Sequence, residues 1–228
     1  PRIDPVQLAD GAGHTVRIVG TVDRVDAMPL EKRSKTYLRV VDYKTGGKEF
    51  KLKEVYYGLD CQMLLYLFTL ERNAQEAFPG ATAAGVEYLL ADPKPESVDR
   101  RELTEEADPA PTYPMNGLLL DDESIYRAMD TKGTGEFVPL SFSAKTGKVL
   151  NSKSTLADEA KLGRIRDHLD GLLIGMAENL YSGRIDAEPL CPGGGKSPCT
   201  YCDFRCACTH RDGEHERTIS IKDDPFAE

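Results

Sequence analysis

The feature that most constrains the fold is a pair of valine-rich segments separated by a short polar stretch. Residues 14–28, "HTVRIVGTVDRVDAM", and residues 36–43, "TYLRVVDY", both alternate polar and apolar side chains, and "EKRS" lies between them. Successive side chains of a strand point to opposite faces, so alternation with period two is typical of strands with one buried face. Two such strands on either side of a short polar connection predict an antiparallel hairpin.

Strand and helix patterns follow one another along the rest of the chain and predict an α/β fold. Apolar residues recur at helical spacing over residues 54–73, before the turn signal "FPG", and residues 82–91 have the pattern of a central strand. The longest helical pattern covers residues 154–183, where Gly183 is placed to cap the C-terminus. Residues 92–135 are rich in proline and acidic residues, so we expect an acidic insertion there with one short helix near "DDESIYRAM".

The composition excludes several classes of protein. The chain has 228 residues, of which 40% are hydrophobic and 29% are charged, as is typical of a globular protein with a sizeable core. Its longest apolar runs, such as "MLLYLFTL", are much shorter than the roughly 20 residues that a membrane-spanning helix needs. The sequence has no signal-peptide pattern either, and we therefore expect a cytoplasmic protein without a membrane partner.

Positive charge is concentrated around the hairpin, although the formal net charge of the chain is −9. This net charge argues against a surface that binds nucleic acid everywhere, because phosphate contacts need positive potential. Between residues 31 and 53, however, eight basic residues face three acidic ones: Lys32, Arg33, Lys35, Arg39, Lys44, Lys48, Lys51 and Lys53 against Glu31, Asp42 and Glu49. The simplest interpretation of this excess is a solvated charged hairpin.

The register of the hairpin brings two carboxylates together. If the connection is centred between Lys32 and Arg33, Asp23 lies directly opposite Asp42, with Cβ atoms about 4.5–5.5 Å apart. Two carboxylates at this distance repel each other unless a proton or a cation lies between them. Mg²⁺ suits such a pair, since it takes oxygen ligands from one or two carboxylates, water and phosphate. Lys44 points to the same face as Asp42 and would lie beside the metal.

The same register places Asp26 on the other face, opposite Arg39, where we expect a structural salt bridge. A surface hairpin with incidental ion pairs is the alternative interpretation of all these charges. The spacing of one aspartate and one lysine does not decide between the two.

Three successive motifs resemble those of the RecB-like branch of the PD-(D/E)XK nucleases. They are "GTVDRVD" (20–26), "VVDYKTG" (40–46) and "VYYGLDCQMLLYL" (55–67). The arginine of the first motif and the amino-acid sequence of the third motif are most similar to the C-terminal nuclease domain of the B subunits of AddAB-type helicase-nucleases. The similarity extends over about residues 14–210.

This resemblance implies a restriction-endonuclease-like core, a mixed central sheet flanked by helices, with a cysteine-rich C-terminal staple. Residues 1–190 would form the nuclease core and residues 191–228 the staple and tail. In the family, the core begins with a helix that carries a metal-binding histidine. His14 starts a strand and lies too close to Asp23 in sequence to replace it. We therefore expect the chain to be part of a longer polypeptide.

The resemblance also implies a metal-dependent deoxyribonuclease. Asp23, Asp42 and the backbone carbonyl of Tyr43 would bind Mg²⁺ or Mn²⁺. Lys44 would orient the attacking water or neutralise charge on the phosphate, so that Asp23, Asp42 and Lys44 are the expected catalytic residues.

The third motif supplies an expected substrate-binding pair, Gln62 and Tyr66. Spaced four residues apart, the two share one helical face and would hold the backbone of single-stranded DNA. In the family, the B-subunit nuclease cuts the 5′-ended strand of an unwound duplex end while an AddA-type subunit drives unwinding, which resects double-strand breaks for homologous recombination. ATP binding is not expected here, because the chain has no GxxxxGK[ST] loop.

Four cysteines lie within ten residues of the tail, in "PCTYCDFRCAC". In a cytoplasmic protein, such a group suggests a metal more than disulfides. The resemblance implies that Cys199, Cys202 and Cys208 bind a [4Fe-4S] cluster whose fourth cysteine lies upstream of the core. That cysteine is absent from this chain, so the fourth ligand would come from another segment or from Cys191 or Cys206.

Several alternatives remain open from the sequence. Zinc could bind three of the cysteines together with His210 or His215, whereas Cys61 is interpreted as a small buried residue. The chain could also be a free-standing Cas4-like iron-sulfur exonuclease, although the insertion argues against this. A catalytically silent scaffold that binds DNA ends is a further alternative, and the presence of Asp42 and Lys44 favours the enzyme over it.

Overall fold

The computed structural model describes residues 2–91, 113, 115–150, 155–191, 197–211, 213–221 and 224–227. The chain divides into two compact units. Unit 1 consists of Pro1–Val6, Val19–Phe50 and Gln62–Gly163, and unit 2 consists of Gln7–Ile18, Lys51–Cys61 and Arg164–Glu228. The chain therefore passes between the units several times.

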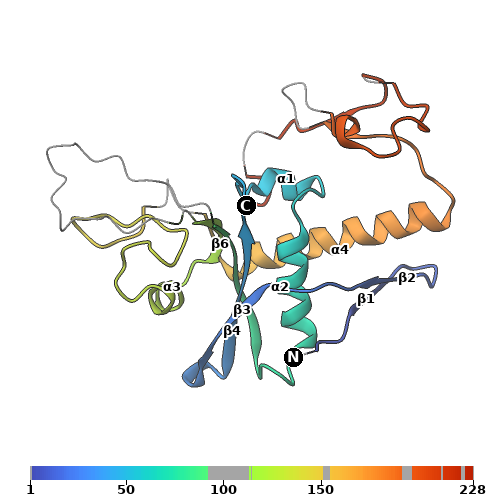
Figure 1. Ribbon diagram of the computed structural model, residues 1–228. Helices are drawn as coiled ribbons and strands as arrows, with labels where there is room; N and C mark the ends of the chain where they lie inside the picture. The colour runs from blue at the N-terminus through green and yellow to red at the C-terminus, as the bar shows by residue number, and fades with distance from the viewer. Residues whose placement is uncertain are drawn as a thin grey trace, which may run out of the picture. The chain divides into compact units, whose positions relative to one another are not determined.

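Unit 1 is built on a mixed five-stranded sheet with the strand order β3-β4-β5-β6-β7 (Figure 1). The β3–β4 and β5–β6 pairs are antiparallel, whereas β4–β5 and β6–β7 are parallel. The prediction of an α/β fold with a mixed central sheet is confirmed. The strands are β3 (Arg24–Leu30), β4 (Lys35–Lys44), β5 (Ala81–Leu90), β6 (Met115–Leu120) and β7 (Leu156–Ala157).

The β3–β4 hairpin has the register that the sequence predicts. A single 3₁₀ turn, η1 (Glu31–Arg33), connects the strands, and Ser34 closes it in the left-handed conformation with φ 51°. Asp26 pairs with Arg39 and Arg24 with Val41. The predicted strand over residues 14–28 is interrupted, however, because β3 begins only at Arg24 and the earlier part belongs to a different hairpin.

The helix predicted over residues 54–73 is wrong as one element. The structure has a short helix, α1 (Leu52–Tyr56), and a longer one, α2 (Gln62–Asn73), with turns between them. Gly58 and Asp60 adopt positive φ angles of 87° and 55° in that connection. Residues in the left-handed conformation end a helix. The helical spacing of apolar residues therefore continues through the connection between α1 and α2, although the backbone there is not helical.

The core of unit 1 lies between α2 and the centre of the sheet. Helix α2 packs on β4 and β5 (Figure 1) and buries Leu64 and Leu67 completely. Strand β4 is buried without interruption from Thr36 to Asp42. The Asp42 carboxylate therefore lies at the edge of the core, directly before the strand becomes exposed at Tyr43.

Part of the region expected to be an acidic insertion belongs to the sheet. Residues 92–112 lie outside the described residues, but β6 pairs with β5 and α3 (Glu123–Met129) follows it. The Asp122 carboxylate caps α3 by accepting a hydrogen bond from the Ser124 amide. Residues 115–120 form β6 between β5 and β7, with Gly117 to Leu120 buried, and the short helix expected near "DDESIYRAM" is present as α3.

Unit 2 contains two small sheets and most of the longest helix. Strands β1 (Val6–Ala9) and β2 (Thr15–Ile18) form one sheet, and β8 (Leu190–Cys191) and β9 (Arg217–Thr218) form the other. Helix α4 (Glu159–Tyr181) begins in unit 1 and continues through unit 2, and Gly183 follows it with φ 76°, as its predicted cap. Within the described ranges, no helix has the length and apolar character to cross a membrane.

Aromatic contacts hold unit 2 together. The rings of Tyr56 and His168 stack with centroids 4.5 Å apart, and Phe226 meets the Tyr56 ring at its edge. His168 Nε2 also lies 2.8 Å from the Tyr56 carbonyl oxygen, which fixes α1 to α4.

Candidate active site

The predicted catalytic residues lie where β4 leaves the core of unit 1. The Asp42 side chain is 12% exposed, and its Oδ2 lies 2.6 Å from Lys44 Nζ. This oxygen is buried and, within the described part of the chain, makes no hydrogen bond, so its contact with Lys44 is an ion pair. A buried carboxylate needs a positive charge nearby, and the Lys44 ammonium supplies it.

An aromatic ring on β5 supports the lysine. Tyr88 pairs with Asp42 in the β4–β5 ladder, and the Lys44 ammonium lies 5.7 Å from the centre of the Tyr88 ring. A cation over the face of an aromatic ring is attracted to it. The ammonium is therefore held between the Asp42 carboxylate and a buried ring, which the sequence motifs did not identify.

Asp23 is exposed and lies one residue before β3. Since Arg24 pairs with Val41, continuing the register by one position sets Asp23 opposite Asp42. No group of three or more His, Cys, Asp or Glu side chains is placed to hold a metal ion within the described ranges. Two carboxylates and the Tyr43 carbonyl nevertheless supply the oxygen donors that Mg²⁺ and Mn²⁺ prefer, so the residues present fit such an ion.

The predicted substrate-binding pair is formed on α2. Gln62 Nε2 donates a hydrogen bond to Tyr66 Oη over 3.0 Å. The Tyr66 ring lies so close to Gly20 that a Cβ atom there would come within 2.5 Å of Tyr66 Cε1. Gly20 thus allows α2 to approach the segment that carries Asp23. In the sequence, this role of Gly20 in helix packing is indicated only by its position as the first residue of the motif "GTVDRVD".

Charged side chains form a second network on the opposite face of the sheet. Arg39 Nη2 lies 2.6 Å from Asp26 Oδ2, which confirms the predicted salt bridge. Arg39 Nη1 also lies 2.7 Å from Glu87 Oε2 and donates to the Phe137 carbonyl. Burial raises the pKa of Glu87 to about 7, although the charge of Arg39 acts in the opposite direction. For Asp26, burial is outweighed by hydrogen bonds from Arg24 and Arg39, which lower the pKa of that carboxyl.

The cysteine-rich segment lies in unit 2. Cys199 is partly buried in the 3₁₀ turn η3 (Pro198–Tyr201), whereas Cys202, Cys206 and Cys208 are exposed. The Cys202 amide donates to the Cys199 carbonyl, so the backbone turns as expected. The described thiols are nonetheless not gathered into a metal-binding group. Thiols attract one another little without a metal, and the turn alone leaves them facing solvent.

Two further cysteines are less suited to metal binding. The Cys61 thiol lies near the Leu59 carbonyl and burial raises its pKa to about 12. Burial also raises the pKa of Cys191, which pairs with Thr218 between β8 and β9. Burial thus favours the thiol over the thiolate, the form that binds metals, at both positions.

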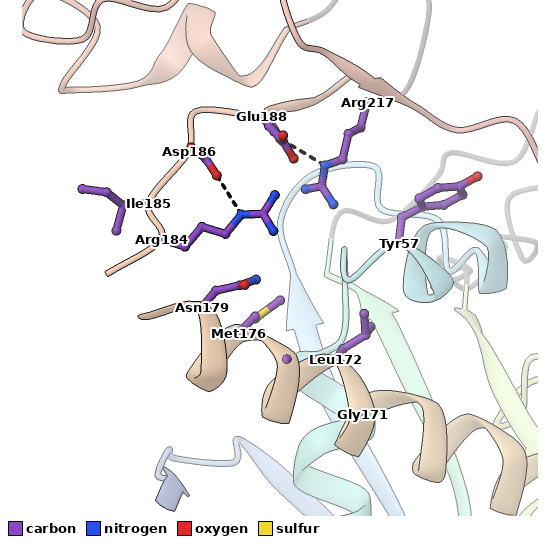
Figure 2. A pocket seen from close by; sticks show the side chains of 11 residues that line it. Tyr57, Gly171, Leu172, Met176, Asn179, Arg184, Ile185, Asp186, Glu188 and Arg217 are labelled. Atoms are coloured by element: carbon purple, nitrogen blue, oxygen red, sulfur yellow. Dashed lines mark hydrogen bonds and ion pairs between the residues drawn. The ribbon is translucent and has the colours of Figure 1, made fainter. Parts of the chain in front are cut away.

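A pocket of about 430 Å³ lies in unit 2, along the C-terminal half of α4 (Figure 2). Its two arginines already have partners, because Arg184 Nε lies 2.7 Å from Asp186 Oδ2 and Arg217 Nε donates to the Glu188 carbonyl (Figure 2). None of the predicted catalytic, substrate-binding or cysteine residues lines this pocket. The pocket is therefore separate from the chemistry at the end of β4.

Comparisons with known proteins show the family of the chain. A family model described as the PD-(D/E)XK nuclease superfamily matches residues 2–209. The chain is also similar to the B subunits of ATP-dependent helicase/deoxyribonucleases. It is 35% identical over 214 residues to that of Clostridium novyi, 33% over 231 residues to that of Clostridium acetobutylicum and 30% over 208 residues to that of a Thermoanaerobacter species.

These alignments cover 90%, 96% and 90% of this chain, but 18%, 19% and 18% of the three relatives. The chain therefore spans about a fifth of the length of the curated relatives that it matches.

Proposed function

The chain belongs to the PD-(D/E)XK nuclease superfamily, and we propose that it hydrolyses phosphodiester bonds of DNA with the help of a divalent metal ion. The observation that carries the proposal is the ion pair of Asp42 and Lys44 at the end of a buried strand, with Asp23 at the opposing register position. This arrangement provides oxygen donors for a cation and a positive charge for a phosphate on one face of the sheet.

Each residue of the site has a chemical role in the proposal. A Mg²⁺ or Mn²⁺ ion bound by Asp23, Asp42 and the Tyr43 carbonyl would polarise the phosphate and lower the pKa of a bound water. The Lys44 ammonium, fixed by Asp42 and the Tyr88 ring, neutralises negative charge that develops on the phosphate oxygens. A fixed ammonium does this without the reorganisation that a mobile side chain would need.

Gln62 and Tyr66 bind the sugar-phosphate backbone of the strand to be cut. Their mutual hydrogen bond orients the amide and the phenol. The close packing of Tyr66 on Gly20 keeps both near the Asp23 segment. This proximity supports a substrate-binding role for the pair beside the carboxylates.

We further propose that this nuclease works as part of a bacterial helicase-nuclease. The names of the relatives combine a helicase and a deoxyribonuclease, so the substrate would be DNA unwound by a partner subunit of the AddA type. Cleavage of the 5′-ended strand, and a role in resecting double-strand breaks for recombination, follow from the motif resemblance alone.

The cysteines are proposed as ligands of a [4Fe-4S] cluster on the basis of the spacing of Cys199, Cys202 and Cys208. Within the described part of the chain, the thiols do not form a group that could hold a metal ion. No step of the proposed reaction depends on them. Metal binding frequently couples to local folding, so a cluster would order this segment once a fourth ligand is supplied.

Asp42→Ala and Lys44→Ala, made in the full-length protein assembled with its partner subunit, test the proposed function. We expect each variant to lose cleavage by at least about 100-fold and to keep DNA unwinding, because the motor lies elsewhere. Lys32→Ala, at the other end of the same hairpin, is the matched control and should cut normally. Cleavage at the unmodified rate in either site variant would rule out the assigned roles.

A further inference from the structure

We propose that Arg24 is a positioning residue, which fixes the two strand ends of the metal site from the opposite face of the sheet by bonding to the hydroxyl of Tyr43. This inference rests on the proposed function and deepens it. It concerns the side chains of Arg24 and Tyr43, which lie on the face of the sheet opposite the Asp42 carboxylate.

The contacts of Arg24 join β3 to β4. Its Nε lies 2.7 Å from Asp26 Oδ1 and its Nη2 lies 3.1 Å from Asp26 Oδ2, a two-point contact that sets the plane of the guanidinium. The remaining nitrogen, Nη1, donates to Tyr43 Oη over 3.3 Å. A hydrogen bond therefore crosses the hairpin at its open end, where β3 begins and β4 is about to end.

The position of Tyr43 explains why this bond matters for the site. Tyr43 lies between Asp42 and Lys44, and its side chain occupies the opposite face, since successive strand residues alternate. Fixing the Tyr43 ring limits rotation of the backbone that carries both neighbours and the Tyr43 carbonyl. Arg24 directly follows Asp23 in the chain. The hydrogen bond between Arg24 and Tyr43 therefore also fixes the distance between Asp23 on one strand and Asp42 on the other.

The far end of the network is rigid enough to brace Arg24. Asp26 also contacts Arg39, whose side chain is 9% exposed, and Arg39 in turn contacts Glu87, whose side chain is 2% exposed. The chain of contacts thus runs across β3, β4 and β5. Arg24 is consequently anchored to the buried sheet and differs from an isolated surface ion pair, which contributes little.

Tyr43→Phe is the sharpest test, because it removes only the hydroxyl that Arg24 contacts. Strand β4 also supplies its matched control, Tyr37→Phe, since Tyr37 Oη accepts a hydrogen bond of 3.1 Å from Arg33 at the other end of the hairpin. Mn²⁺ binding to the full-length protein is measured by electron paramagnetic resonance. We expect Tyr43→Phe and Arg24→Gln to weaken Mn²⁺ binding on the order of tenfold, as loss of a supporting contact around a metal does, and Tyr37→Phe to leave it unchanged.

Asp42→Asn separates the two proposals. If Asp42→Asn abolishes Mn²⁺ binding while Tyr43→Phe binds like the unmodified protein, Arg24 is not a positioning residue and the metal site stands. If Asp42→Asn binds Mn²⁺ normally, the proposed function fails and this inference fails with it. We expect Tyr43→Phe to bind Mn²⁺ more weakly than the unmodified protein. We also expect its melting temperature to fall no further than that of Tyr37→Phe.

Discussion

At the scale of single residues, two buried carboxylates on neighbouring strands have opposite surroundings. Asp42 forms an ion pair with the Lys44 ammonium on the side of the sheet that carries the site. Glu87 lies on the other side and contacts the Arg39 guanidinium. Burial outweighs this contact and raises the pKa of Glu87 to about 7. The first carboxylate is suited to binding and the second to bracing the sheet.

The raised pKa of Glu87 predicts a pH-dependent contribution to stability. The folded state favours the protonated form, so this contribution is fully present below the unfolded value of 4.5 and is lost as the pH rises through about 7. We expect the difference in unfolding free energy between the unmodified protein and Glu87→Gln to change by roughly 2–3 kcal/mol between pH 5 and pH 8. Urea unfolding at the two pH values measures it. A difference that does not vary with pH would show that Glu87 keeps an ordinary pKa.

At the scale of elements, the hairpin was predictable and the elements around it were less so. The register followed from the short polar connection centred between Lys32 and Arg33, because the length of a hairpin connection fixes the pairing of its strands; alternation alone does not fix it, since β4 is buried on both faces from Thr36 to Asp42. The break between α1 and α2 was missed, since the left-handed backbone of Asp60 leaves no apolar signal. Tyr88 and Glu87 were missed as well, because their roles depend on which face of β5 meets β4. Gly20 was visible only as part of a motif.

Gly20→Ala tests how closely α2 must approach the Asp23 segment. The new methyl group would lie 2.5 Å from Tyr66 Cε1, so the Tyr66 ring must shift from its position beside the Asp23 segment, or α2 must move away. We expect a loss of stability of about 1–3 kcal/mol, the usual cost of overpacking, and a marked drop in DNA cleavage. Gly11→Ala is the control, because a Cβ atom there meets nothing within 4 Å. Equal cleavage by the two variants would mean that the contact with Tyr66 does not position the site.

At the scale of the whole molecule, the cysteine-rich tail is not a separate appendage. The sequence suggested a division near residue 190, but the tail shares unit 2 with Gln7–Ile18 and Lys51–Cys61. Every predicted catalytic and substrate-binding residue belongs to unit 1. The sequence pattern alone could not predict whether the cysteine thiols come together, because ligation depends on a metal and on a fourth ligand as well as on the spacing of the cysteines.

The proposed cluster has a spectroscopic consequence. Full-length protein purified without oxygen should absorb broadly near 400 nm and contain iron, because thiolate-bound iron-sulfur clusters are coloured. Cys202→Ala should lose both properties, whereas Cys61→Ala should keep them. Zinc in place of iron, with no absorbance, would instead favour the alternative of a zinc site.

Metal rescue of Asp42→Cys tests whether the Asp42 carboxylate binds the catalytic metal ion. A thiolate is a poor ligand for Mg²⁺ but a good one for softer ions such as Cd²⁺. DNA cleavage by the full-length Asp42→Cys protein is measured with Mg²⁺ and then with added Cd²⁺, beside Asp42→Ala. We expect the cysteine variant to be inactive in Mg²⁺ and to regain cleavage with Cd²⁺, while the alanine variant stays inactive. Equal activity of the cysteine and alanine variants under every metal condition would contradict this role of Asp42.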